Sequence, residues 1–581
     1  MGAAPAAMTS EADKRVHEGS GLGMVWCWIH VISFLADKER VGSASRICVA
    51  FLRATNAMKR SATFYRRKEL GYEMWNRGLS FDLVRAAHAR FPALIKVKID
   101  VDAELPQNED DDESDSLPVP GLLQLLPELA GFGSITQLLL FGNGLTEFPL
   151  SLCALVRLTE LNLGRNMLPS LPAAIGALTE LKIFRLAYNS LATLPASMAA
   201  MTGLTTLRLD ENRFATVPDV VTTMVWLQEL YIDENPVSEL PESIGAMTGL
   251  KTLSARGCQL DSIVDTLGAL TQLETLDLSH NALGELEVEI WGMPGLTTLN
   301  LSHNLIKTLS APGRALDSIV DNSRGALTQL KTLDLSHNSL EELEVEIWGM
   351  AGLTTLNLSH NLLDDDDDGL NVPDVIIIGM PALKTLDLSH NSLSFDSPTG
   401  RMFTSMAGLK TLNLSHNLVH DFPREMARLT GLTTLDLGYQ WEEEEEDFPS
   451  WFSGLTGLTT LRLGGMHMTV LPDVIPALTA LVTLDLQNND ITSLPEAIVA
   501  LTGLDAIIVA DNPLTRPQSD AVEAWLTQKM RQGSRVLPES DVEAWLTRGI
   551  RTDEDELRNE ETYIRRSLAA YGGSRDDHKW F

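Results

Sequence analysis

Six histidines stand directly before an asparagine in a six-residue motif that recurs along the middle of the chain. The letters LDLSHN or LNLSHN begin at residues 276, 299, 333, 356, 386 and 412, so half of the twelve histidines fall in one column. The members of this column are His280, His303, His337, His360, His390 and His416. Histidine binds metal ions and changes its charge near neutral pH. The column therefore indicates a metal site, a pH-dependent surface or an inheritance of sequence duplication.

The elements that position these histidines follow a longer pattern, L-x-x-L-x-L-x-x-N. It recurs every 23 residues from Asn143 to Asn304, with Cys258 at one asparagine position, and continues with four insertions to Asn512. We expect the leucines of each copy, such as Leu299, to point inward from a short strand. We also expect the asparagine, such as Asn304, to bond backbone groups where the strand ends. One copy cannot build a core alone, so the copies must stack.

Between the strands, stretches such as LTSLPEAIVALTGL (491–504) place apolar residues at helical spacing, which predicts a short turn or helix on the convex side. The whole pattern is the leucine-rich repeat signature. Over roughly 120–535 it resembles the 23-residue repeats of intracellular Ras-binding scaffolds and of plant Ras-group-related leucine-rich proteins. This resemblance implies an α/β solenoid of horseshoe shape. It also implies a protein-binding function without catalysis.

The segment 22–90 lacks the repeat and is predicted to be helical. Its apolar residues follow the order of an F-box, and they are Ile29, Ile32, Phe34, Leu35, Val41 and Phe51. The resemblance to this family implies docking of residues 22–62 onto the adaptor of cullin-RING ubiquitin ligases. The chain has Val25 and Trp26 where the family usually opens with Leu-Pro. A plain helical cap on the first turn of the solenoid is the alternative.

These patterns predict five regions. They are a disordered N-terminus (1–21), the F-box-like domain or cap (22–90), a first strand-like turn with an acidic linker (91–118), a solenoid of about 16 turns (119–515) and a C-terminal helical cap with a tail (516–581). The fold class is therefore α/β, a leucine-rich repeat solenoid with a small N-terminal helical domain and a C-terminal helical cap.

The resemblance places the fifth, seventh and eighth letters of each repeat on the concave side or its rim. The eighth letters are the histidine column, and the fifth letters alternate as Asp277, Asn300, Asp334, Asn357, Asp387, Asn413 and Asp436. A ladder of parallel side chains spreads its ligands along a line, whereas a metal needs convergent ligands, so we predict no metal site. Residues 268–304 and 325–361 differ at only four of 37 positions. We interpret the column as inherited by copying, with a polar stripe that binds a partner as the alternative.

Charge and cysteine usage indicate which kind of partner the chain binds and in which compartment it is located. Residues 1–100 carry 16 Lys and Arg against 9 Asp and Glu, whereas the whole chain has a net charge of −34, so the repeats are strongly acidic. An acidic surface repels nucleic acid and anionic membranes and favours a basic protein partner. The four cysteines are widely scattered, which favours a reducing, cytoplasmic location. The apolar stretch 24–35 is too short to span a bilayer.

No phosphate loop, dinucleotide fingerprint or hydrolase motif is present in the sequence. We therefore predict neither an enzyme nor a bound cofactor. The favoured function is a scaffold that binds a protein on its concave face in intracellular signalling. The alternative is an F-box substrate receptor of a ubiquitin ligase.

Overall fold

The structure is a computed structural model, and the described residues fall in several ranges. These are 61–65, 96–100, 134–284, 293–309, 327, 329–343, 347, 350–364, 380–395, 398–419, 422–440, 448–515, 519–531 and 535–537. The chain divides into two compact units, Met1–Leu260 and Asp261–Phe581. We call them unit 1 and unit 2 and describe each by itself.

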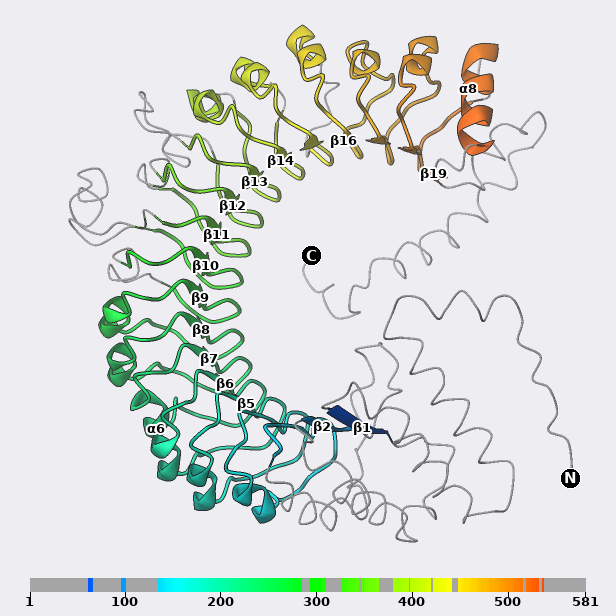
Figure 1. The fold of residues 1–581 in the computed structure, drawn as a ribbon. Helices are drawn as coiled ribbons and strands as arrows, with labels where there is room; N and C mark the ends of the chain where they lie inside the picture. Colours follow the sequence, from blue (N-terminus) through cyan, green and yellow to red (C-terminus); the bar gives the residue numbers. More distant parts are fainter. Residues whose placement is uncertain are drawn as a thin grey trace, which may run out of the picture. The chain divides into compact units, whose positions relative to one another are not determined.

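Unit 1 is a parallel sheet of short strands that pair in chain order. The strands are β1 (Ser61–Tyr65), β2 (Lys96–Asp100), β3 (Gln137–Leu139), β4 (Glu160–Asn162), β5 (Ile183–Arg185), β6 (Thr206–Arg208), β7 (Glu229–Tyr231) and β8 (Thr252–Ser254). Short helices lie between successive strands from β3 onward, on the opposite side of the unit (Figure 1). They are η1 (Leu150–Ala154), η2 (Ala173–Ala177), η3 (Ala196–Ala200), α6 (Asp219–Thr222) and η4 (Glu242–Ala246), of which all but α6 are 3-10 helices.

Strand β1 corrects one part of the sequence prediction. We expected helices throughout 22–90, but Ser61–Tyr65 is a strand that pairs in parallel with Lys96–Asp100. Its sequence SATFY contains a β-branched residue and two aromatic residues, which favour an extended chain. The F-box-like residues Ile29, Ile32, Phe34, Leu35, Val41 and Phe51 lie outside the described residues.

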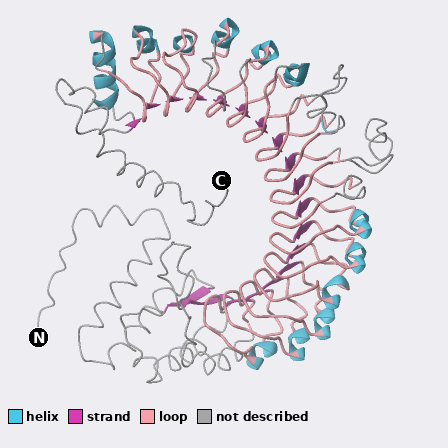
Figure 2. Ribbon diagram, turned by 180° about the vertical axis from the view of Figure 1, so that it is seen from behind, coloured by secondary structure: helices cyan, strands magenta, loops and turns pink. Residues whose placement is uncertain are grey.

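Unit 2 repeats the same arrangement. Its strands are β9 (Thr275–Asp277), β10 (Thr298–Asn300), β11 (Thr332–Asp334), β12 (Thr355–Asn357), β13 (Thr385–Asp387), β14 (Thr411–Asn413), β15 (Thr434–Asp436), β16 (Thr460–Arg462), β17 (Thr483–Asp485), β18 (Ala506–Ile508) and β19 (Arg535–Leu537). Each pairs in parallel with the next. The 3-10 helices are η5 (Asp265–Ala269), η8 (Pro398–Ser405), η9 (Arg424–Arg428), η10 (Ser450–Gly454), η11 (Ile475–Ala477) and η12 (Glu496–Ala500). Within each unit, strands and helices lie on opposite sides (Figure 2).

The core follows directly from the repeat pattern. The middle residue of each strand from β3 to β18, such as Leu299, is fully or almost fully buried, while the residues before and after it are mostly half-exposed. Strand residues alternate between the two faces of a sheet, so the leucines enter the core and their neighbours form an outward strand face. Proline precedes many of the 3-10 helices, as Pro172 precedes η2, and its restricted φ supports the extended approach to the helix. We expected a short turn or helix in each connection between strands. In most repeats this element is a 3-10 helix.

The C-terminal part of unit 2 contains the helix α8 (Asp520–Arg531), which lies between β18 and β19 in the sequence. Lys529 Nζ donates hydrogen bonds to the carbonyl oxygens of Thr502 and Leu504 in the preceding turn. That this segment serves as a cap stays a prediction. None of the helices in the described ranges combines the length and the apolar character needed to cross a bilayer.

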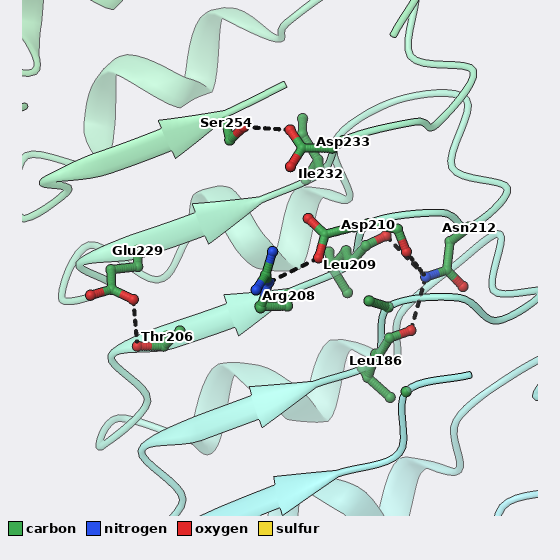
Figure 3. Close-up of polar contacts among 12 residues, drawn as sticks. Leu186, Thr206, Arg208, Leu209, Asp210, Asn212, Glu229, Ile232, Asp233 and Ser254 are labelled. Atoms are coloured by element: carbon green, nitrogen blue, oxygen red, sulfur yellow. Dashed lines mark hydrogen bonds and ion pairs between the residues drawn. The ribbon is translucent and has the colours of Figure 1, made fainter. Parts of the chain in front are cut away.

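The repeated asparagine joins each turn to the one before it. Asn212 Nδ2 donates to the carbonyl oxygen of Leu186, 26 residues earlier, at 3.0 Å and to that of Leu209 at 2.9 Å (Figure 3). Its Oδ1 accepts a hydrogen bond from the Leu191 backbone N–H at 3.0 Å. Asn304 makes the same set of bonds, which confirms the backbone role expected for this position. Cys258, the substitute in this column, keeps part of this set: its Sγ lies 3.5 Å from the Ile232 carbonyl oxygen and also has hydrogen bonds with the backbone of Asn235 and Val237.

Candidate functional site

The strand face of unit 2 brings the predicted partner-binding residues into two parallel rows. The strand register aligns the fifth letters directly across successive turns, as Asp277 with Asn300 and Asn300 with Asp334. We call this line the Asp/Asn row, and it comprises Asp277, Asn300, Asp334, Asn357, Asp387, Asn413 and Asp436. The second line, which we call the histidine stack, comprises His280, His303, His337, His360, His390 and His416.

Each carboxylate or amide oxygen of the Asp/Asn row caps the end of its own strand. Asp277 Oδ1 accepts hydrogen bonds from the Ser279 backbone N–H at 2.9 Å and from the Ser279 hydroxyl at 2.6 Å. Asn300 Oδ1 accepts the same two bonds from Ser302. The serines of this column are buried. We expected the seventh letters on the concave side or its rim, which is wrong for these serines because the fifth letter holds each hydroxyl beneath it.

The alternation of Asp and Asn creates hydrogen bonds between turns. Asn300 Nδ2 donates to Asp277 Oδ2 at 3.2 Å, and Asn413 Nδ2 donates to Asp387 Oδ2 at 3.1 Å. Asn357 and Asp334 are joined in the same way, at 3.4 Å. The alternation keeps carboxylates two turns apart, about 9.6 Å at the usual strand spacing, and so reduces their mutual repulsion. The row therefore presents regularly spaced negative charge.

The last carboxylate of the row, Asp436, has a different partner. Arg462 Nη1 lies 3.3 Å from Asp436 Oδ2, and the Gly438 backbone N–H donates to Oδ1 at 3.1 Å. Burial raises the pKa of Asp436, while the Gly438 hydrogen bond and the Arg462 charge oppose that rise. Asp436 is thus partly neutralised by a neighbour within the chain, and among the described residues no other carboxylate of the row has such an ion pair.

The six histidine rings stack face to face along the turns. The centroids of neighbouring rings are 3.8 to 4.0 Å apart and their planes differ by 10 to 13°. All six residues have positive φ, between 52° and 56°, and the backbone N–H of His280 donates to the Ser302 carbonyl oxygen in the next turn. This left-handed conformation is uncommon for residues other than glycine, although asparagine, aspartate and histidine adopt it more often than the rest. Its repetition gives every ring the same orientation.

The stack ends at Tyr439 and a glycine. The ring of Tyr439 lies 4.8 Å from that of His416 with the planes 4° apart, and Gln487 Nε2 donates to the Tyr439 hydroxyl at 3.2 Å. The next turn has Gly465 at the stacking position, with φ +63°. A Cβ there would lie 2.4 Å from Tyr439 Cδ1. The glycine therefore leaves space for the tyrosine ring.

Four rings of the stack have surroundings that disfavour the protonated form. Burial lowers the pKa of His337, His360, His390 and His416, and the charge of another histidine of the stack lowers it further. The carboxylate of Asp334 opposes this effect at His337, and that of Asp387 opposes it at His360 and His390. The parallel rings direct their nitrogens side by side, and in the described ranges no group of three or more His, Cys, Asp or Glu residues has the geometry to hold a metal ion.

Unit 1 has a second polar surface that our sequence reasoning missed. Arg208 Nε donates to Asp210 Oδ2 at 3.0 Å, and its guanidinium lies 4.4 Å from the centre of the Tyr231 ring. Asp233 on the next turn accepts a hydrogen bond from the Ser254 hydroxyl (Figure 3). The sequence indicates this surface in the segments LRLDEN (207–212) and LYIDEN (230–235). Each is the end of one repeat, and the fifth, seventh and eighth letters of these repeats depart from the Asp/Asn-Ser-His pattern. The repeat pattern is defined by its recurring letters, whereas this surface is built from the variable ones.

Asp210 is the most perturbed carboxylate of that surface. Its side chain is buried, with 6% of the residue exposed, and Oδ1 has no hydrogen-bond partner among the described residues. Burial raises the pKa of Asp210 to about 6; Arg208 opposes the rise and Asp233 adds to it. The carboxyl is still mostly ionised at neutral pH, and its ionisation there costs the folded state stability relative to the unfolded chain.

We predict that Asp210→Asn stabilises unit 1 at pH 7.5 by about 1–3 kcal/mol. The folded pKa lies above the unfolded one, so wild-type stability is greatest below the unfolded pKa and is lost as pH rises through about 6. The gain should accordingly shrink toward pH 4.5. Urea unfolding at both pH values measures it, with Glu180→Gln at an exposed position as a control. A variant that is less stable than wild type at pH 7.5 would contradict this account.

Comparisons with known proteins identify the repeat. The leucine-rich repeat family models match residues 261–310, 313–363 and 382–401. The chain thus contains leucine-rich repeats, and its parallel strands fit the α/β solenoid fold of such repeats. These models indicate no catalytic family. A search of curated proteins found no match.

Several solved structures are similar to this chain. A leucine-rich repeat protein of Leptospira interrogans is 26% identical, with a TM-score of 0.58, over 78% of this chain and 97% of the other. The ectodomain of the Arabidopsis thaliana receptor kinase GASSHO1/SCHENGEN3, in complex with CASPARIAN STRIP INTEGRITY FACTOR 2, is 26% identical, with a TM-score of 0.50, over 69% of this chain and 50% of the other. Drosophila Toll, in complex with Spatzle, is 20% identical, with a TM-score of 0.52, over 74% and 52%, and shows the fold alone.

Proposed function

We propose that this chain is a non-catalytic scaffold that binds a basic protein partner on the strand face of unit 2. The observation that carries the proposal is the Asp/Asn row, which places a carboxylate on every second turn of one face. The net charge of the chain, −34, attracts a basic partner and steers it toward such a face. Binding of a partner is also supported by the Arabidopsis ectodomain, which was solved in complex with CASPARIAN STRIP INTEGRITY FACTOR 2.

We expect the affinity for this partner to fall as salt rises from about 50 to 300 mM, because ions screen charges on an exposed surface. Replacing Asp277, Asp334 and Asp387 by Asn should remove most of this salt dependence. The experiment compares the wild-type chain and the triple variant as baits for affinity capture. The captured partner is then titrated against both by calorimetry at the two salt concentrations.

The chain itself supplies the reason why the triple variant should fold. Asn already occupies the same position in Asn300, Asn357 and Asn413, where it accepts the same serine hydrogen bonds. Equal melting temperatures of variant and wild type would confirm this control. An affinity for the partner that does not depend on salt concentration, or that is unchanged in the triple variant, would show that the Asp/Asn row is not the contact surface.

Cytoplasmic signalling remains part of the proposal. It is supported by the cysteine usage, since Cys153 and Cys258, which lie in the described ranges, are both free and buried. Burial raises the pKa of each thiol, to about 11 for Cys258, so both are poor nucleophiles. These cysteines are suited to a structural role.

The alternative function, a substrate receptor of a ubiquitin ligase, rests on the order of apolar residues in 22–62. If it is correct, the full-length chain should capture the cullin-RING adaptor from a cell extract. Replacing Phe34 and Leu35 by Ala should abolish that capture, while the leucine-rich repeats stay folded. Absence of the adaptor from the wild-type capture would leave the helical cap as the interpretation of this segment.

A further inference from the structure

A line of threonine side chains runs beside the Asp/Asn row on the same outward face of unit 2. The residue two places before each member of the row is a threonine, as Thr298 is for Asn300, and strand residues two places apart share a face. We call this line the threonine column, and it comprises Thr275, Thr298, Thr332, Thr355, Thr385, Thr411 and Thr434. The threonine column therefore extends over the same turns as the Asp/Asn row.

The hydroxyls of the threonine column are available to a ligand. All seven threonines are half-exposed, and in the part of the chain that the structure describes their hydroxyls have no hydrogen-bond partner. The adjacent Thr297 differs, because its hydroxyl donates to the Glu274 carbonyl oxygen at 2.8 Å. A hydroxyl can both donate and accept a hydrogen bond. The face thus offers a hydroxyl on every turn and a carboxylate on every second turn.

The spacing of the carboxylates restricts the shape of a ligand that pairs with several of them. Asp277, Asp334 and Asp387 stand on alternate turns in register, so successive ones lie about 9.6 Å apart at the usual strand spacing. In a polyproline II (PPII) segment, every third residue faces the same side, at intervals of about 9.3 Å. An α-helix presents every seventh residue on one side, at intervals of about 10.5 Å. Over three carboxylates the helix departs from the row by about 1.8 Å, whereas the PPII segment departs by about 0.6 Å.

The backbone of the ligand separates these shapes further. A β-strand places the residues of one face about 6.7 Å apart, which does not fit the row. An α-helix forms its backbone hydrogen bonds internally and has no use for a line of hydroxyl donors. A PPII segment has no internal hydrogen bonds, so its carbonyl groups need donors when it docks. The threonine column supplies such donors along the whole length of the Asp/Asn row.

We propose that the partner of the unit 2 face contributes a PPII segment in which a basic residue recurs at every third position. Its basic side chains pair with Asp277, Asp334 and Asp387, and its backbone carbonyls accept hydrogen bonds from the threonine column. This inference rests on the proposed function, because it names the class of partner for the same face. Proline suits the positions between the basic residues, since its restricted φ favours PPII and lowers the entropy lost on binding.

Two synthetic peptides of equal composition test the spacing on the full-length chain. In the first peptide, three arginines are each followed by two prolines, and in the second the three arginines are adjacent. Adjacent residues of a PPII segment point in different directions, so one arginine at a time pairs with the row. Fluorescence anisotropy at pH 7.5 and about 50 mM salt measures both affinities. We expect the first peptide to bind about tenfold more tightly, because it forms two more ion pairs.

Two outcomes of this comparison would overturn the inference. One is equal affinity of the two peptides, or no binding of the first. The other is tighter binding of a helical peptide that carries three arginines at every seventh position, because a helix would then be the ligand.

A variant of the chain with the same net charge tests whether the spacing of the row is responsible. Asp334→Asn combined with Asn357→Asp moves the middle carboxylate one turn toward Asp387. Both residue types already accept the serine hydrogen bonds at this position of the repeat, so the variant should fold, and its melting temperature checks this. We expect the preference for the first peptide to disappear. A preference that stays at its wild-type value would overturn the inference.

The threonine column is tested by Thr298→Val combined with Thr332→Val, which keeps the shape of the side chains and removes two hydroxyls. Valine is favoured in strands, so the array should remain folded. We expect the affinity for the first peptide to fall about fivefold or more, because two hydrogen bonds are lost. An unchanged affinity would show that the PPII backbone does not lie on these threonines.

The peptide titrations and the affinity capture separate the inference from the proposed function. If the captured partner loses its salt dependence in the variant with Asn at 277, 334 and 387, and the two peptides bind equally, the proposed function stands and the PPII inference is wrong. If the first peptide keeps its affinity in that variant, its binding site is not the Asp/Asn row, and the inference fails whatever the captured partner does.

Discussion

Replacing Leu299 by Asp is expected to unfold the centre of unit 2. Leu299 is fully buried in β10, between Leu276 of β9 and Leu333 of β11 in the strand register. An ionised carboxylate at this position would have no partner in an apolar core, which costs on the order of 5 kcal/mol or more. Because each turn is stabilised by its neighbours, the loss should spread along the array. Circular dichroism and the melting temperature measure the effect.

The matched control for this variant is Thr298→Asp in the same strand. Thr298 is half-exposed and faces outward, so the same charge there remains solvated. We expect its effect on stability to stay within about 1 kcal/mol. A Leu299→Asp protein with the melting temperature of wild type would refute the assignment of the leucine to the core.

The second large effect is expected from Asn304→Ala. Asn304 Nδ2 donates to the carbonyl oxygens of Leu278 and Leu301, and its Oδ1 accepts from the Leu283 backbone N–H at 3.1 Å. Alanine would leave these backbone groups buried without partners, so we expect a loss of about 3–5 kcal/mol in the free energy of unfolding. Urea unfolding followed by circular dichroism measures this loss.

The chain suggests the comparison variant, Asn304→Cys. Cysteine occupies the equivalent position at Cys258, where its Sγ contacts the Ile232 carbonyl oxygen. We therefore expect Asn304→Cys to lose less stability than Asn304→Ala. Equal stability of Asn304→Ala and wild type would mean that the asparagine bonds contribute nothing to the joining of turns.

The repeat pattern predicted the strands well because each of its letters has a simple physical role. The leucine spacing places Leu299 and its equivalents in the core, and the 23-residue period aligns successive strands in register. The surface was harder to predict. Whether the serine between Asp277 and His280 points outward depends on a hydrogen bond to Asp277, and no letter pattern shows that bond. The ring-to-ring distance in the histidine stack likewise depends on the backbone conformation of His280 and its equivalents.

The variable letters explain the other failure of prediction. Arg208, Asp210 and Tyr231 interact across two turns, and none of them fits the Asp/Asn-Ser-His pattern of the turns that carry the histidines. An interpretation based on that recurring pattern overlooks them. Their pairing becomes evident only when the strand register sets Arg208 beside Tyr231. The acidic runs at 109–115, 364–368 and 442–447 are typical of solvated loops that interrupt the repeat. Apart from Asp364 they lie outside the described residues, so this role stays a prediction.

The amide-to-carboxylate bonds between turns impose a parity on any growth of this array. Asn300 donates to Asp277, and the near-identical segment 325–361 repeats that pair as Asn357 and Asp334. A copied segment of two turns preserves the order Asp, Asn, Asp, Asn wherever it is inserted between complete pairs. A copied segment of one turn would set two aspartates or two asparagines side by side, about 4.8 Å apart. Gene duplication can therefore lengthen this surface by even numbers of turns without changing its electrostatics, whereas an odd step demands a compensating substitution.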